Sequence, residues 1–206
     1  MTIGTRQIHR IFAAIIGAFV VLHLGNHLLA WGGVDMHTAG LQIVRLIYRN
    51  PLSEAVLIAA VTGQIIIGLR LAHACWRTGV DRGWGRLQLG SGLVLAIFLG
   101  AHMGAALSAR WLSGIDPNFY WPAGTLTIAP LKYGFWPYYL IAVFSLFAHI
   151  ASALHFHGRA KTARALLTVG TIAAPIVVLP FSGLIYDIAL PAEHLEYFAN
   201  LTALAA

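Results

Sequence analysis

Five long apolar runs alternate with short polar segments along the chain. Each run is about 20 residues long, the length at which a helix rising about 1.5 Å per residue crosses roughly 30 Å of hydrocarbon. The pattern therefore predicts an all-α chain with five membrane-spanning helices. Pro175 and Pro180 predict a kink in the fifth helix, because proline cannot donate the helical hydrogen bond. We place the five helices near residues 11–31, 54–76, 87–109, 136–156 and 165–188.

The two longest connections between these runs also predict structure. Residues 32–53 contain the sequence GLQIVRLIYRN, which suits a helix lying in the membrane interface. Residues 112–135 contain three prolines and the aromatic run FYW, so we expect an ordered cap rich in tryptophan and tyrosine there. No internal repeat or separate soluble domain is evident, and residues 1–206 are interpreted as a single transmembrane domain.

The composition favours a membrane protein over a soluble one. Hydrophobic residues make up 59% of the 206 residues, charged residues make up 10%, and the mean hydropathy is +0.76. A soluble domain carries about a quarter charged residues. The apolar run after Arg10 is too long for a signal-peptide core and is not followed by a small-residue cleavage site, so we expect no cleavable signal. The single cysteine, Cys75, excludes a disulfide framework and a cysteine-ligated cluster within the chain.

The basic residues predict the orientation in the membrane. The formal net charge is +6, and most positive charges lie before the first helix, between the second and third, and between the fourth and fifth. These segments share one side, which the positive-inside rule makes cytoplasmic, so the N-terminus is expected inside and the C-terminus outside. Arg45 and Arg49 are exceptions on the outer side. We expect a multi-pass protein of a bacterial-type cytoplasmic (inner) membrane, and the scattered patches do not indicate nucleic-acid binding.

Four histidines lie inside four successive apolar runs, where water cannot serve as their partner. Counted from the basic helix ends, His23 and His102 lie roughly 20–24 Å up, and His73 and His149 lie roughly 6–15 Å up. Two histidines at matched depth on different helices can ligate a haem iron from both faces. The chain is therefore predicted to be a haem-binding domain with an outer pair, His23 and His102, and an inner pair, His73 and His149.

Two further residues inside apolar runs can support such cofactors. Arg70 lies one turn from His73 and needs either an anion or a route to the surface. A haem propionate is the candidate anion. His27 follows His23 by four residues on nearly the same helix face. It is a candidate to replace His23 as a ligand, or to bond a propionate or a quinone.

Polar residues elsewhere are weaker candidates. Ser91, like other serines inside apolar runs, can bond either a ligand histidine or its own helix backbone. His9, His37 and His194 lie in polar stretches, where we expect solvated side chains. His37 can also line an outer site together with Asp35.

Short motifs on the first four helices resemble one known family. They are HLGN beginning at His23, LRLAH ending at His73, FLGAHMG around His102 and FAHIASALH around His149. With the five helices, they resemble the five-helix, dihaem cytochrome b membrane anchor of succinate:quinone and quinol:fumarate oxidoreductases, over nearly the whole chain. In that family each of the first four helices supplies one axial histidine. The resemblance implies that His23 and His102 bind the distal haem b, and that His73 and His149 bind the proximal haem b.

The resemblance also implies partners. A flavoprotein subunit with FAD and an iron–sulfur subunit would dock on the cytoplasmic side, and this chain would pass electrons between them and a membrane quinone, with menaquinone expected. The chain would be the non-dehydrogenase subunit of a complex that can form higher oligomers. Glu54, Asp35 and His37 are the candidates for a quinone site. Glu54 also suits a charge in the first turn of its helix, beside Ser53.

Two features depart from the family pattern. The outer segment 112–135 is longer than expected. Phe147 occupies the position two residues before the fourth-helix histidine, where some dihaem members carry a glutamate associated with proton passage. A coupled proton path of that kind is therefore not expected.

Three alternatives stay open from the residues alone. A cytochrome b can serve a hydrogenase, a formate dehydrogenase or another quinone-linked donor. A transporter with metal- or proton-binding histidines would place them at one depth near carboxylates, which are nearly absent from the apolar runs. A haem-free anchor would need to satisfy four buried histidines at considerable cost.

Overall fold

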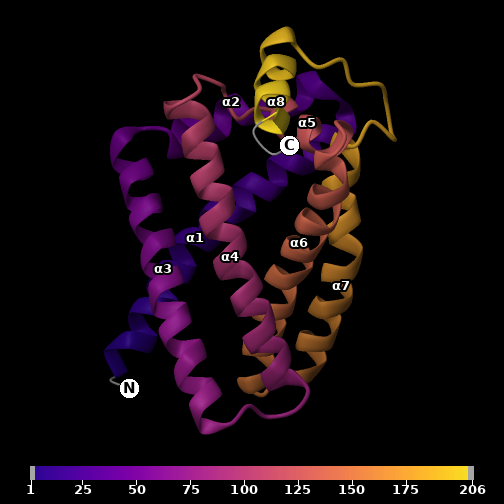
Figure 1. The fold of residues 1–206 in the computed structure, drawn as a ribbon. Coiled ribbons are helices and arrows are strands. Elements are labelled where there is room, and N and C mark those ends of the chain that lie inside the picture. Colours follow the sequence, from indigo (N-terminus) through magenta and orange to yellow (C-terminus); the bar gives the residue numbers. More distant parts are fainter. Residues whose placement is uncertain (1–2, 204–206) are drawn as a thin grey trace.

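The protein is an all-helical bundle (Figure 1) in a computed structural model that describes residues 3–203. Five of its helices are long and apolar enough to cross a membrane. This confirms the predicted number of spans, although each helix extends beyond the predicted range at one or both ends. The five helices are α1 (Ile3–Leu29), α3 (Pro51–Thr78), α4 (Trp84–Trp111), α6 (Leu131–Phe156) and α7 (Ala160–Val178).

Three shorter helices gather at the end of the bundle that holds the C-terminus (Figure 1). Helix α2 (Val34–Tyr48) confirms the helix expected in the first long connection, and α5 (Tyr120–Thr127) orders the second. Helix α8 (Ala192–Ala203) follows the last span. The N-terminus and the connections α3–α4 and α6–α7 lie at the opposite end. The predicted basic segments thus share one end of the bundle, because two spans separate each of them from the next.

The last span is shorter than predicted. Helix α7 continues through Pro175 but ends at Val178, and a single 3-10 turn, η2 (Leu179–Phe181), follows it. Pro180 lies in this turn, and Gly183 then adopts a φ of +73°, a left-handed conformation that glycine reaches without strain. Phe181, Tyr186 and Ile188 pack instead at the end of the bundle that holds the C-terminus, which we call the outer end, whereas Leu184 and Ile185 are exposed there.

Tight packing is concentrated at the outer end of the bundle. One cluster joins Ala30 to Phe119 and Phe181, and a second joins Trp121 to Phe198 of α8. The spans themselves are packed unequally. The buried share of the most apolar window is 39% in α6 and 33% in α7, but only 11% in α1 and α3 and 6% in α4. The surfaces of α1, α3 and α4 are therefore left for lipid, cofactors or partner chains.

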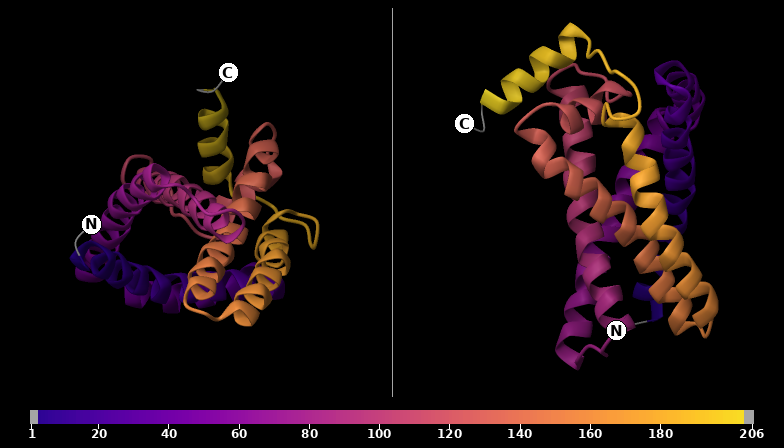
Figure 2. Two further views of the ribbon diagram at one scale, coloured as in Figure 1. Left: turned by 90° about the horizontal axis from the view of Figure 1, so that it is seen from below. Right: turned by 90° about the vertical axis from the view of Figure 1, so that its right-hand side faces the viewer.

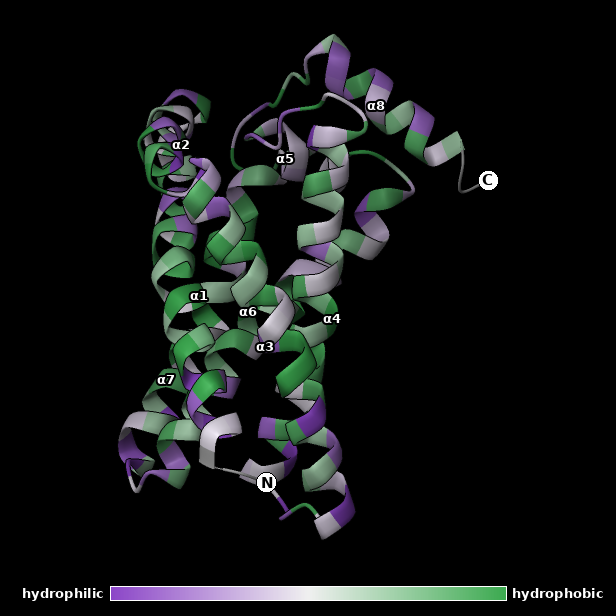
Figure 3. Ribbon diagram, turned by 90° about the vertical axis from the view of Figure 1, so that its left-hand side faces the viewer, coloured by the Kyte–Doolittle hydropathy of each residue, from purple (hydrophilic) through white to green (hydrophobic). Residues whose placement is uncertain are grey.

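Views along and across the bundle agree with this unequal burial of the spanning helices. Seen from below, α1, α3, α4 and α6 form a ring, and α7 lies outside it against α6 (Figure 2). Hydrophobic residues occupy the middle of the bundle, and hydrophilic residues collect at its two ends (Figure 3). The middle matches hydrocarbon and the ends match the polar headgroup regions.

Candidate functional site

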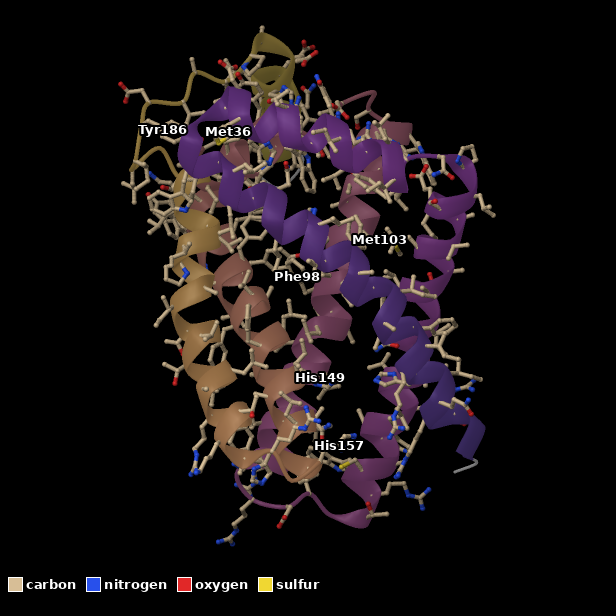
Figure 4. The ribbon with its side chains drawn as sticks, turned by 180° about the vertical axis from the view of Figure 1, so that it is seen from behind. Met36, Phe98, Met103, His149, His157 and Tyr186 are labelled. Carbon is tan, nitrogen blue, oxygen red and sulfur yellow. The ribbon has the colours of Figure 1, made fainter. Side chains whose placement is uncertain are left out.

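The outer half of the bundle encloses a mainly apolar cavity of about 290 Å³. Side chains from α1, α2, α3, α4 and α6 line it, and Phe98 and Met103 mark its position in Figure 4. Most of the residues that line the cavity are aliphatic or aromatic, and a few histidines and charged residues supply its polar groups. These polar residues include His23, His27, His37, His102, Glu54 and Arg110.

The cavity brings together the predicted outer pair. The ring centres of His23 and His102 lie 6.1 Å apart, with the rings inclined by 67°. Two metal–nitrogen bonds of about 2 Å each, with about 1 Å from each nitrogen to its ring centre, separate two axial imidazoles by roughly 6 Å. The observed separation of the ring centres matches this spacing, and the Nε2 of His23, now hydrogen-bonded to His27, would have to be released to ligate a metal.

An aromatic ring backs each of these histidines. Phe19 stacks on His23 at 5.2 Å and 21°, and Phe98 stacks on His102 at 5.0 Å and 12°. Both phenylalanines precede their histidine by four residues, so each pair lies on one helix face. Sequence reasoning missed this repeated Phe-x-x-x-His pattern, which is visible in FVVLH and FLGAH. The stacking holds the plane of each imidazole before any ligand binds.

The structure separates the roles of His23 and His27. The Nε2 atoms of the two side chains are 3.2 Å apart, which is a hydrogen bond between the rings. His27 makes no ring contact with His102 among residues 3–203; its ring stacks on His37 at 5.7 Å. His23 is therefore the residue positioned opposite His102, and His27 is its neighbour towards the outer end.

Of the predicted inner pair, only His149 is held in an orientation that suits a metal ligand. The Nδ1 of His149 lies 3.1 Å from the carbonyl oxygen of Gln88, to which it donates, and 3.4 Å from the hydroxyl of Ser91. This arrangement leaves Nε2 free, as in histidines that ligate metals. Gly92 makes room for the ring, because a Cβ there would lie 3.0 Å from the Cε1 of His149.

His73 is not brought against His149. Its side chain is exposed and, within the described part of the chain, makes no hydrogen bond or ring contact. Arg70, also exposed, forms no ion pair there. His9 lies in this region instead, half-buried, with its Nε2 accepting a hydrogen bond of 3.3 Å from the amide of Gln64. The expectation that His9 is solvated is therefore wrong.

The quinone candidates separate into two that line the cavity and one that does not. Glu54 lines it and pairs with Arg110 from the end of α4. The helix-capping role belongs to Asn50, whose side chain accepts a 3.0 Å hydrogen bond from the backbone N–H of Ser53. Asp35 is exposed and does not line the cavity.

His37 is a buried lining residue of the cavity and not a solvated one. Its side chain is 2% exposed, and neither ring nitrogen has a hydrogen-bond partner. Phe119 and Phe181 pack edge-on against the ring. Burial, with a smaller contribution from the nearby Arg45, lowers the pKa of His37 to about 4, so the ring is neutral at pH 7. The expectation of a solvated side chain is also wrong for His194, which is fully buried.

An ion cluster explains the two exceptional outer arginines. Arg45 and Arg49 both reach the carboxylate of Asp116, at 2.9 and 2.8 Å. Partial burial raises the pKa of Asp116, but the two guanidinium groups lower it by more, so the carboxylate stays ionised. The cluster fastens α2 over the cavity to the connection after α4. The four-residue spacing of the arginines was the available sequence signal, but their partner is distant in the chain.

Comparisons with family models, curated proteins and solved structures find no match to this chain. Within residues 3–203, no group of three or more histidine, cysteine, aspartate or glutamate side chains is placed to hold a metal ion by itself. The site is therefore interpreted from its own geometry.

Proposed function

We propose that this chain is a membrane cytochrome b that binds two haems b between its helices and conducts electrons across the bilayer. One observation carries the proposal: His23 and His102 both line an apolar cavity with their ring centres 6.1 Å apart, each with a phenylalanine stacked on its ring. Haem iron takes axial histidines in this way, and it supplies reversible one-electron transfer when bound.

The protein's own residues would position and insulate the cofactors. His23 and His102 would ligate the outer iron, and the hydrogen bond between His23 and His27 would be exchanged for a metal bond at Nε2. At the inner site, His149 would ligate through its free Nε2, with its Nδ1–H held by the carbonyl of Gln88. His73 is the proposed opposite ligand, and Arg70 the proposed propionate partner.

We further propose that the chain anchors a complex of the succinate:quinone or quinol:fumarate oxidoreductase type. A flavoprotein with FAD and an iron–sulfur subunit would dock at the basic, cytoplasmic end. Electrons would pass between that end and a membrane quinone, menaquinone in this proposal. Glu54 and His37 line the outer cavity and are the preferred quinone residues; Asp35 is disfavoured by its position.

The first test is the haem content of the purified complex. Pyridine haemochrome measured against protein should give two haems b per chain, together with flavin and iron–sulfur partners. Two haems with a different donor subunit would support the cytochrome and reassign the complex. A chain that purifies folded but without haem would overturn the proposal.

A matched set of histidine variants tests the ligand assignment. His102→Ala and His23→Ala should each leave one haem per chain, because a bis-histidine site loses its iron when an axial ligand is absent. His27→Ala is the control from the same helix face and should keep both haems. Loss of haem from His27→Ala with retention in His23→Ala would reverse the assignment.

A further inference from the structure

A second recess lies outside the histidine cavity, at the outer end of the bundle. It is a surface groove of about 750 Å³ between the start of α6 and the segment 182–188. Lys132, Tyr133 and Trp136 line it from α6, and Leu184 and Asp187 line the opposite rim. No part of the proposed haem or quinone chemistry uses these residues.

The groove contains two opposite charges that do not neutralise each other. Lys132 and Asp187 both line it, but within residues 3–203 neither forms an ion pair. The ammonium of Lys132 instead lies over the ring of Tyr133, 5.4 Å from its centre. The positive end of the long helix α6 lies beside Lys132 and adds to the attraction for an anion there. The groove therefore offers a position for an anion on one side and a position for a cation on the other.

The rim that carries Asp187 is held in place. Tyr186 donates a 2.7 Å hydrogen bond to the carbonyl of Ala30 and stacks on Phe119; Figure 4 labels it at this end of the bundle. The hydroxyl of Ser182 accepts a 3.1 Å hydrogen bond from the N–H of Leu184. The segment that carries Asp187 is thus anchored to the bundle, opposite Lys132 in the groove.

The groove also lies at the end of a candidate membrane span, next to the expected headgroup region. Lys132 and Tyr133 are in the first turn of a spanning helix, at the boundary between hydrocarbon and water. Trp136 and Tyr133 are the residue types that gather at this boundary. The side chain of Leu184, 71% exposed, continues the groove onto the apolar surface of the bundle, where acyl chains can pack.

We propose that this groove binds a phospholipid with a zwitterionic primary-amine headgroup, of the phosphatidylethanolamine type. Lys132 and the start of α6 hold the phosphate, and the carboxylate of Asp187 accepts hydrogen bonds from the ammonium. An anionic lipid satisfies only the first position and is repelled at the second. A choline headgroup carries the positive charge but has no N–H to donate. This inference does not depend on the proposed function.

Native mass spectrometry of the full-length, delipidated chain tests the proposal. Phosphatidylethanolamine, phosphatidylcholine and phosphatidylglycerol with the same acyl chains are titrated separately. Phosphatidylethanolamine should bind about two- to fivefold more tightly than either of the others, the range expected for one partly exposed charge pair. Equal affinity for all three lipids, or tighter binding of phosphatidylglycerol, would overturn the proposal.

Two charge-neutralising variants separate the two positions. Lys132→Gln should weaken both phosphatidylethanolamine and phosphatidylglycerol, by about fivefold. Asp187→Asn should weaken phosphatidylethanolamine about two- to threefold and leave phosphatidylglycerol unchanged or tighter, because only the amine position is lost. Lys161→Gln and Asp81→Asn, exposed at the other end of the bundle, are matched controls and should change neither affinity. If Asp187→Asn leaves the lipid preference unchanged, Asp187 does not bind the ammonium of the headgroup.

Discussion

The polar side chains of this apolar bundle are placed in small, specific groups. Phe19 and Phe98 orient two imidazoles, a backbone carbonyl orients a third, and Asp116 forms ion pairs with two arginines. His37 and His194 differ, because each is buried and neither of its ring nitrogens has a hydrogen-bond partner. A buried polar group without a partner costs free energy, so it marks a position where a ligand can improve the fold.

The protonation of His37 gives a prediction at the scale of one residue. The ring protonates below pH 6.5 when unfolded but only below about pH 4 when folded. The unfolded chain therefore binds the additional proton between these pH values, and stability falls as the pH is lowered from 6.5 to 4. The difference between the two pKa values of His37 corresponds to a loss of stability of at most about 3 kcal/mol, at about 1.4 kcal/mol per pKa unit.

Replacing the ring tests this dependence. The free energy of unfolding, measured in detergent, should fall less between pH 7 and pH 4 for His37→Phe than for the wild type. The phenyl ring is buried but cannot take a proton. His157→Phe, at an exposed position of the inner end, is the control and should keep the wild-type dependence. Parallel stability curves for wild type and His37→Phe would show that His37 does not titrate in this range.

At the scale of elements, the outer helices form a cap over the cavity. Helix α2 contributes His37 and is fastened by Asp116, and α5 contributes Trp121 beside His102. Helix α8 packs on α5 where Gly124 faces the ring of Phe198, which is fully buried. A side chain at position 124 would collide with that ring, so the close approach of α5 and α8 depends on this glycine.

The α5–α8 contact gives a prediction about one substitution. Gly124→Ala should destabilise the protein by about 1–3 kcal/mol, because the added methyl group overpacks a filled contact. Thermal unfolding and protease sensitivity of α8 would measure this effect. Gly134→Ala, in a helix with open space around the glycine, should be neutral or slightly stabilising.

A second substitution distinguishes overpacking from a general effect. Adding Phe198→Leu to Gly124→Ala should recover part of the lost stability, since the smaller side chain makes room for the methyl group. If the double variant is simply as unstable as the two single changes combined, the two residues are not coupled through this contact.

At the scale of the whole molecule, the bundle is polarised. Its outer end is packed and capped, while α1, α3 and α4 leave most of their surface to other molecules. The basic connections lie at the other end. This polarity predicts that the basic end faces the cytoplasm.

Cysteine labelling measures that orientation. In a Cys75→Ser background, a cysteine introduced by Ser113→Cys should react with a membrane-impermeant maleimide in intact cells. A cysteine introduced by Asp81→Cys should react only after the cells are permeabilised. Both positions are exposed, so access depends on the side of the membrane. The reverse labelling pattern would invert the topology.

Local properties were sufficient for much of this fold. Hydrophobic run length predicts the five spans, and the depth of each histidine along its helix predicts that His23 and His102 lie at one level. Helix geometry is regular and hydrophobicity is a property of each segment, so these conclusions need no knowledge of neighbours. The end of the last span was mispredicted, because the helix ends at Val178 and the chain turns so that Tyr186 and Ile188 pack on the outer end.

The remaining features depended on contacts between distant segments. His37 is buried because α2 folds over the cavity, and Asp116 pairs with arginines 67 and 71 residues away in sequence. Lys132 and Asp187 share a groove only because a loop after the last span returns to the start of α6. Whether a polar residue is solvated, paired or presented to a ligand is decided by what packs against it. Local sequence therefore sets the helices and the depth of their side chains, and tertiary packing sets their partners.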